Sequence, residues 1–135
     1  MITVDNVKIQ FLDKRTLTET RRSVMRGFAR VAAYTRVVAR NSIRRGTKGG
    51  GVSQPGRPPK SRTGLLKKHI YFWQDWKNQS VQIGPARLAG TASKDIPGAL
   101  EDGGFVDGVK IGARPYMQPA LDKAKSRLST AIRAN

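Results

Sequence analysis

TLTETRRSVMRGFARVAAYTRVVARNSIRR, residues 16–45, is the stretch that decides the fold. It contains no proline, and Gly27 alone interrupts residues that a helix accepts. Thr16 and Thr18 are the two candidate caps of a helix start, and Thr16 lies three residues before Glu19, which is the capping-box spacing. The stretch therefore predicts one long helix that ends near Arg45, about 27 residues and about 40 Å long at 1.5 Å per residue.

The charged and apolar side chains of this predicted helix fall on opposite faces. At 100° per residue, six arginines lie within about 120° of one another. These six form what we call the arginine row: Arg22, Arg26, Arg30, Arg36, Arg40 and Arg44. The opposite face gathers Leu17, Val24, Phe28, Val31, Thr35, Val38 and Ala39. We expect this second face to pack inward and the arginine row to point outward.

The arginine row has no acidic partner within the helix. Neither Asp nor Glu stands four residues from any of its members, and like charges at this spacing destabilise an isolated helix by a few tenths of a kcal/mol per pair. We expect an outside anion to offset this repulsion, either DNA phosphate or the acidic surface of a neighbouring protein. An ordinary solvated basic face is the alternative.

The positive charge of the chain is concentrated in one half. The 135 residues include 26 Lys plus Arg and 9 Asp plus Glu, for a net charge of +17. Residues 14–68 hold 16 of the basic residues and a single acid, Glu19. A surface this basic attracts nucleic acid, acidic protein or anionic lipid.

Length and composition narrow the class of protein. The length suits a single domain, residues 1–135. The absence of Cys excludes disulfides, thiolate catalysis and sulfur-ligated zinc. No apolar run approaches the roughly 18 residues of a membrane span. A basic amphipathic helix lying on a membrane is a weaker alternative, because the apolar face of the long helix is needed for the core, so we expect no membrane partner.

Residues 46–62, GTKGGGVSQPGRPPKSR, follow the helix and form what we call the basic arm. Five Gly and three Pro cannot build a core, which predicts a long flexible or extended segment. Lys48, Arg57 and Lys60 are further candidates for contact with an anion, because basic arms often become ordered on binding one. A solvated disordered loop is the alternative.

Short elements are predicted in the rest of the chain. A helical turn at 63–66 leads into a strand at 69–76, which pairs with a second strand at 80–84 as a hairpin. Residues 85–104 read as a loop and 105–111 as a third strand.

The two ends of the chain complete the predicted architecture. Residues 119–134 read as a last helix with a proline at its start, and residues 2–12 as a strand or hairpin arm. The fold class is therefore α+β, with the long basic helix and the C-terminal helix packed on a small, mainly antiparallel sheet.

The hairpin is rich in aromatic residues. Strand alternation places Ile70, Phe72 and Trp76 on one face with a core role, and Tyr71 and Trp73 on the other. This pattern favours a core or a subunit interface over stacking of single-stranded bases, which is the alternative.

Residues that could support catalysis are few. His69 is the one histidine, so no pair of imidazoles can hold a metal. Glu101, Asp102 and Asp107 are acids in a Gly-rich region, where solvation or pairing with Arg is commoner than cation binding. We expect no metal site, no cofactor and no enzymatic activity.

Three segments resemble those of a known family. They are RTGLLKKHI at 62–70, ALEDGG at 99–104 and ARPYMQPAL at 113–121, in this order after a long first helix. Together they resemble the small head–tail joining (neck) proteins of long-tailed bacteriophages over roughly residues 16–134. In the third segment Pro115 favours an extended Arg114, and Pro119 suits a first helical turn.

The resemblance implies a structural protein of the virion, made in the host cytoplasm. It implies a homo-oligomeric ring, commonly of six copies, between the portal or head-closure assembly of the capsid and the tail. The implied partners are head-closure or adaptor proteins, tail-terminator or tail-tube proteins, and packaged double-stranded DNA.

In such a ring, acidic residues near 95–107 of one copy would meet basic residues of the next. The candidate subunit-interface residues are Glu101, Asp102, Arg114, Tyr116 and Met117. Tyr116 and Met117, with Leu121, are also expected to anchor the last helix. A tail-terminator or tail-completion role and a free nucleic-acid-binding module are the alternatives.

Overall fold

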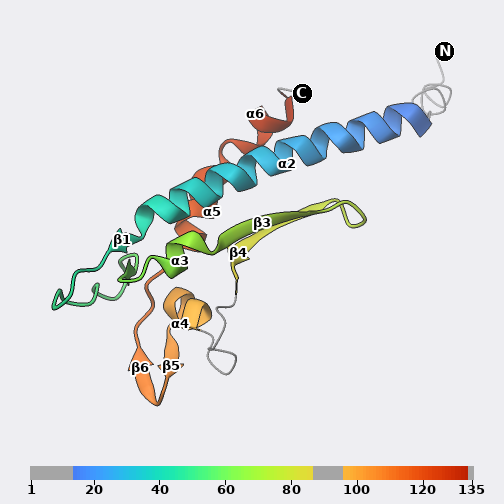
Figure 1. The fold of residues 1–135 in the computed structure, drawn as a ribbon. Helices are drawn as coiled ribbons and strands as arrows, with labels where there is room; N and C mark the ends of the chain where they lie inside the picture. The colour runs from blue at the N-terminus through green and yellow to red at the C-terminus, as the bar shows by residue number, and fades with distance from the viewer. Residues whose placement is uncertain (1–13, 87–95, 134–135) are drawn as a thin grey trace, which may run out of the picture.

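A long helix, α2 (Lys14–Ser42), runs along the whole of the molecule in the computed structural model, which describes residues 14–86 and 96–133 (Figure 1). The predicted long helix is thus confirmed, but its ends differ from the prediction. Thr16 lies inside the helix rather than capping it, and the Thr18 hydroxyl donates to the carbonyl of Lys14 at 2.8 Å. Residues 2–12, predicted as a strand or hairpin arm, lie outside the described residues.

After α2 the chain forms a small parallel pair. β1 (Arg44–Arg45) pairs with β2 (Lys60–Ser61), so the helix ends at Ser42 instead of continuing to Arg45. The basic arm is the connection between these two strands. The pair brings the beginning and the end of the arm side by side.

The predicted aromatic hairpin is present. A short helix α3 (Leu65–Lys68) leads into β3 (Ile70–Asp75), which pairs antiparallel with β4 (Ser80–Pro85). The Asp75 carboxylate accepts hydrogen bonds from the backbone N–H groups of Lys77 and Asn78 and from the Asn78 side chain. These bonds, chiefly those from Asn78, hold the pKa of Asp75 below its ordinary value and fix the turn.

The aromatic side chains of the hairpin divide almost as predicted. Ile70 is buried and Phe72 half-buried against α2, while Tyr71 is exposed and Trp73 is 61% exposed. The predicted core role of Trp76 is wrong. Trp76 lies beyond the last residue of β3, where the alternation of the strand no longer applies, and it is 53% exposed.

The segment from 96 to 111 differs from the prediction of a loop and one strand. It contains a helix, α4 (Ile96–Asp102), followed by a hairpin of β5 (Gly104–Val106) and β6 (Val109–Ile111). The chain reverses at Asp107 and Gly108, which both have positive φ values, so the predicted strand folds into two. Among the described residues the strands thus form three separate pairs, two of them antiparallel.

The predicted C-terminal helix is divided in two. α5 (Met117–Lys125) and α6 (Leu128–Arg133) are separated at Ser126 and Arg127, and α5 starts two residues before Pro119. Arg127 places its guanidinium over the ring of Tyr34 on α2, with 4.1 Å between the guanidinium carbon and the ring centroid. The break lets both helices follow α2 (Figure 1).

The core lies where α2, β3 and α5 meet. Tyr116, which is 1% exposed, packs in one cluster with Ala39, Ile43, Ile70 and Ala120. Alanine at the positions where the helices cross allows close approach of their backbones. The α+β fold class predicted from the sequence is therefore confirmed.

α4 and α5 are joined through one carboxylate. The oxygens of Glu101 accept hydrogen bonds from the backbone N–H groups of Tyr116, Met117 and Gln118 at 2.8 to 3.1 Å. These are the groups that a helix start leaves without an internal partner, and a negative charge there also opposes the helix dipole. Glu101 therefore fixes α5 to the segment 96–111.

We expect Glu101→Ala to lower the free energy of unfolding by about 2 kcal/mol, because three backbone donors lose a charged acceptor. Urea denaturation followed by circular dichroism measures the change. Asp102→Ala is the matched control, because Asp102 is the neighbouring acid and is exposed; it should change the value by less than about 0.5 kcal/mol. Equal effects of both variants would contradict the role of Glu101.

Gly27 provides a second test, because α6 crosses α2 at this residue. A Cβ at Gly27 would lie 2.9 Å from Cγ1 and 3.0 Å from Cα of Ile132. Gly27→Ala should therefore destabilise the protein by about 1–3 kcal/mol, although alanine favours an exposed helix by about 1 kcal/mol over glycine. A gain in thermal stability of Gly27→Ala would show that α6 does not pack there.

Candidate anion-binding surfaces

The arginine row is divided by its surroundings into three parts. Arg22, Arg26 and Arg30 are exposed on the N-terminal half of α2. Arg36 and Arg40 are half-buried beside β3, and Arg44 lies beyond the helix in β1. The helical projection predicts one continuous outer face, but the six residues do not form one.

The two half-buried arginines attach the hairpin to α2. The Arg36 guanidinium lies over the ring of Phe72, 5.3 Å from its centroid. Arg40 donates through Nη2 to the carbonyl oxygens of Lys68 at 3.0 Å and Ile70 at 3.1 Å. Both residues therefore have a structural contact inside the fold, with an aromatic ring or with carbonyls instead of a carboxylate.

The other members of the row keep their charge available. Within residues 14–86 and 96–133, the ion pairs are Arg15–Glu19 at 3.6 Å and Lys125–Asp122 at 3.1 Å, and neither involves the row. Glu19, the acid nearest to the row in the sequence, therefore pairs with Arg15. In the second ion pair, the hydrogen bonds that Asp122 accepts from Lys125 and Gln118 hold its pKa below the ordinary value.

The two strands β1 and β2 lie at the centre of what we call the basic groove. It consists of three adjoining pockets of about 780, 420 and 630 Å³. The first two share Arg44, and the last two share Arg45, Arg62 and Thr63. The basic residues that line the groove are Arg44, Arg45, Lys48, Arg57, Lys60, Arg62, Lys67 and Lys68.

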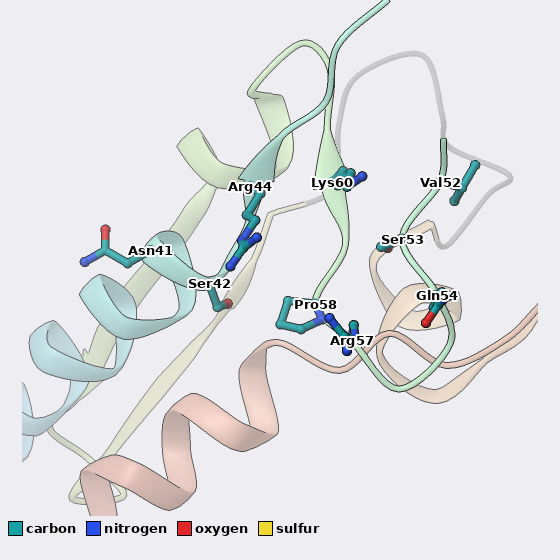
Figure 2. A pocket seen from close by; sticks show the side chains of 9 residues that line it. All are labelled: Asn41, Ser42, Arg44, Val52, Ser53, Gln54, Arg57, Pro58 and Lys60. Carbon is teal, nitrogen blue, oxygen red and sulfur yellow. The ribbon is translucent and has the colours of Figure 1, made fainter. Parts of the chain in front are cut away.

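Figure 2 shows the 780 Å³ pocket at the end of α2. Its three basic residues come from three segments: Arg44 from β1, Arg57 from the loop of the basic arm, and Lys60 from β2. Ser42 and Ser53 add hydroxyl groups to the lining. The pocket thus has the donors that an anion requires, and no acid among the described residues lines it.

The returning half of the basic arm is held in place, although its composition predicts a flexible segment. Gly56 donates its N–H to the carbonyl of Ala113 at 2.7 Å, and Pro59 is fully buried. Arg114 donates through Nε to the carbonyl of Ser53 at 2.8 Å and through Nη1 to that of Gly112 at 3.0 Å. These contacts give the groove a defined wall.

Most of the predicted subunit-interface residues have contacts within the chain. Glu101 caps α5, Arg114 holds the basic arm, Tyr116 is buried, and Met117 packs against the core cluster. Asp102 is exposed. Leu121 is half-buried and, with Tyr116, attaches α5 to α2 as expected of anchors.

Both hairpins expose apolar side chains. Trp73 and Tyr71 line a shallow pocket of about 420 Å³ on the outer face of β3 and β4. Phe105, which is 71% exposed, and Val109 stand on the β5–β6 hairpin, which projects away from α2 (Figure 1). Exposed apolar groups of this size are typical of surfaces that contact another protein.

Sequence reasoning missed four residues of the basic groove, Arg45, Arg62, Lys67 and Lys68. Lys67 and Lys68 were visible as an adjacent basic pair, but only the β1–β2 pairing places them beside Arg45 and Arg62. Over the described parts of the chain, no group of three His, Asp or Glu residues is placed to hold a metal, and no helix is both long and apolar enough to span a membrane.

No family model, curated protein or solved structure matches this chain.

Because the arginine row is divided, substitution of a half-buried arginine should change the free energy of unfolding more than substitution of an exposed one. Arg40→Ala should lower the free energy of unfolding by about 2 kcal/mol, because it removes two charge-assisted hydrogen bonds. Arg30→Ala should change it by less than about 0.5 kcal/mol, since Arg30 is exposed. Urea denaturation of both variants measures the difference, and equal values would contradict the structural role of Arg40.

Proposed function

We propose that this chain is a structural protein of the neck of a long-tailed bacteriophage. In this proposal it forms a homo-oligomeric ring, of six copies, that joins the portal or head-closure assembly to the tail. The ring helps to retain or pass the packaged DNA, lies beside adaptor and tail-terminator or tail-tube proteins, and needs no cofactor. The resemblance of three sequence segments suggests this role, and the exposed charge of α2 supports it.

The observation that carries the proposal is the state of Arg22, Arg26 and Arg30. They follow one another at intervals of four residues, are exposed, and have no carboxylate among the described residues to pair with. Neighbours at this spacing repel each other. An acidic surface on an adjacent ring removes the repulsion and adds charge-assisted hydrogen bonds, so the free chain is suited to a partner.

The exposed hairpins support the formation of a ring. Closed rings use heterologous contacts, in which one patch meets a different patch on the next copy. The β5–β6 hairpin carries exposed Phe105 and Val109 together with Asp107, whereas the α2 half of the chain is basic and exposes Trp73. Asp107 is balanced by exposed Lys110 on the same hairpin, so what the two surfaces share is exposed apolar side chains, which suits a contact between copies.

Genetic complementation tests the proposal. We expect deletion of the coding sequence from its phage to give DNA-filled heads and separate tails, and the wild-type chain to restore joined particles. Arg26→Glu/Arg30→Glu should fail to restore them, because it replaces the proposed contact with repulsion. Its fold should be kept, since Glu beside the remaining Arg22 forms a favourable helical pair.

Lys77→Glu/Lys123→Glu is the control for this experiment. It changes the net charge by the same amount at two exposed residues on other elements, and it should restore joined particles. Joined particles without the chain would overturn the proposal. Tails of uncontrolled length would support a tail-terminator role instead, and particles restored by the Arg26/Arg30 variant would show that these arginines are merely solvated.

A further inference from the structure

We infer that the basic groove is a binding site for the phosphate backbone of double-stranded DNA. This inference deepens the proposed function, and rests on it where DNA is placed at the ring, because it names the surface that contacts the DNA and the part of the DNA that is bound. It also stands on different residues. Arg30 is the nearest of the three exposed helix arginines, and it lies twelve residues before Ser42, about 18 Å along the helix axis.

The three pockets of the groove adjoin one another. They join through shared residues, Arg44 at one junction and Arg45 with Arg62 at the other. The cations are therefore spread over three neighbouring pockets instead of surrounding a single point. An extended polyanion suits such a spread, since a strand of duplex DNA presents one phosphate per about 3.4 Å of helix axis.

The charge of the groove is not neutralised from within the described chain. No acidic residue lines any of its three pockets. Lys60 donates to the carbonyl of Gly51 at 3.2 Å, whereas Arg45, Lys67 and Lys68 are exposed. Cations that remain in water can exchange their counterions for phosphates at little cost in desolvation.

The other groups in the groove also suit phosphate. The hydroxyls of Thr47 and Thr63 line the same pockets, whereas the Ser42 hydroxyl donates to the carbonyl of Ala39 and the N–H groups of Gly46 and Gly64 donate to Ser61. Hydroxyl and backbone N–H groups provide many of the contacts that proteins make to DNA phosphates. The groove thus combines charge with neutral donors.

The lining argues against two other classes of ligand. Within residues 14–86 and 96–133 no aromatic side chain lines the groove, so these residues give it no platform on which single-stranded bases would stack. Its apolar lining is limited to a few residues such as Val52 and Pro58, whereas the centre of a protein–protein interface is apolar and rich in aromatics. Contact with the backbone of a duplex, independent of its sequence, fits best.

Three segments keep the groove in shape before any ligand binds. The β1–β2 pair aligns Arg44 with Lys60, and Arg114 ties the arm to residues 112–114. The Arg40 side chain holds the end of α3, from which Lys67 and Lys68 project. A site formed in advance loses less conformational entropy on binding.

The experiment measures binding of the full chain to a fluorescently labelled duplex of mixed sequence, by anisotropy at several KCl concentrations. The test variant is Arg45→Ala/Lys67→Ala/Lys68→Ala. The matched control is Lys77→Ala/Lys110→Ala/Lys123→Ala, which removes three exposed charges outside the groove. Circular dichroism confirms that each variant is folded.

We expect the plot of log K against log [KCl] to become shallower by about 2.7 in the groove variant, at about 0.9 per lost phosphate contact. The control should keep the wild-type slope. Arg45→Lys/Lys67→Arg/Lys68→Arg should restore it, which separates a need for charge from a structural effect. Sequence changes in the duplex should leave the affinity unchanged.

Two results would overturn the inference. Equal loss of slope in the groove variant and the control would mean a general attraction of DNA to the whole basic chain. Tighter binding of poly-glutamate than of duplex, lost in the groove variant, would mean that the groove receives an acidic protein. Neither result bears on head–tail joining, so failure here and failure of the proposed function are read independently.

Discussion

Between Glu19 and Asp75 the chain contains no acidic side chain, and the rest of the structure depends on this constraint. A guanidinium in this region has no acidic side chain near it in the sequence, and the contacts that the structure shows are with a ring and with backbone carbonyls. Arg36 takes the ring of Phe72, and Arg40 takes the carbonyls at the end of α3. The hairpin is thereby attached to α2, and the remaining arginines are left to the outside.

The elements that were predicted correctly are those that depend on residues close together in the sequence. Helical periodicity without proline indicated α2, and strand alternation with a polar turn indicated the β3–β4 hairpin. The failures have equally physical reasons. Pro97 and Gly98 made residues 96–102 resemble a loop, but proline is accepted in the first turn of α4. The Asp107-Gly108 pair, flanked by strand-forming residues, was a hairpin signal in the sequence that the prediction of a single strand overlooked.

The candidate site was predictable only in part, because its geometry comes from distant pairings. The helical projection showed which face of an isolated helix carries the arginine row. It contained no information about the hairpin that covers Arg36 and Arg40. The basic groove depends on a pairing of residues 44 and 60 across the arm. Similarly, Glu101 resembled an interface acid, whereas its donors lie fifteen to seventeen residues further along.

The parallel pair of β1 and β2 is only two residues long. So short a ladder contains few hydrogen bonds, and parallel pairing is slightly weaker per residue than antiparallel pairing. The two sides of the groove therefore depend in part on the shortest strand pairing among the described residues. If this pair opens, Arg44 and Lys60 separate, while the bonds from Gly56 to Ala113 and from Arg114 to Ser53 still hold the arm.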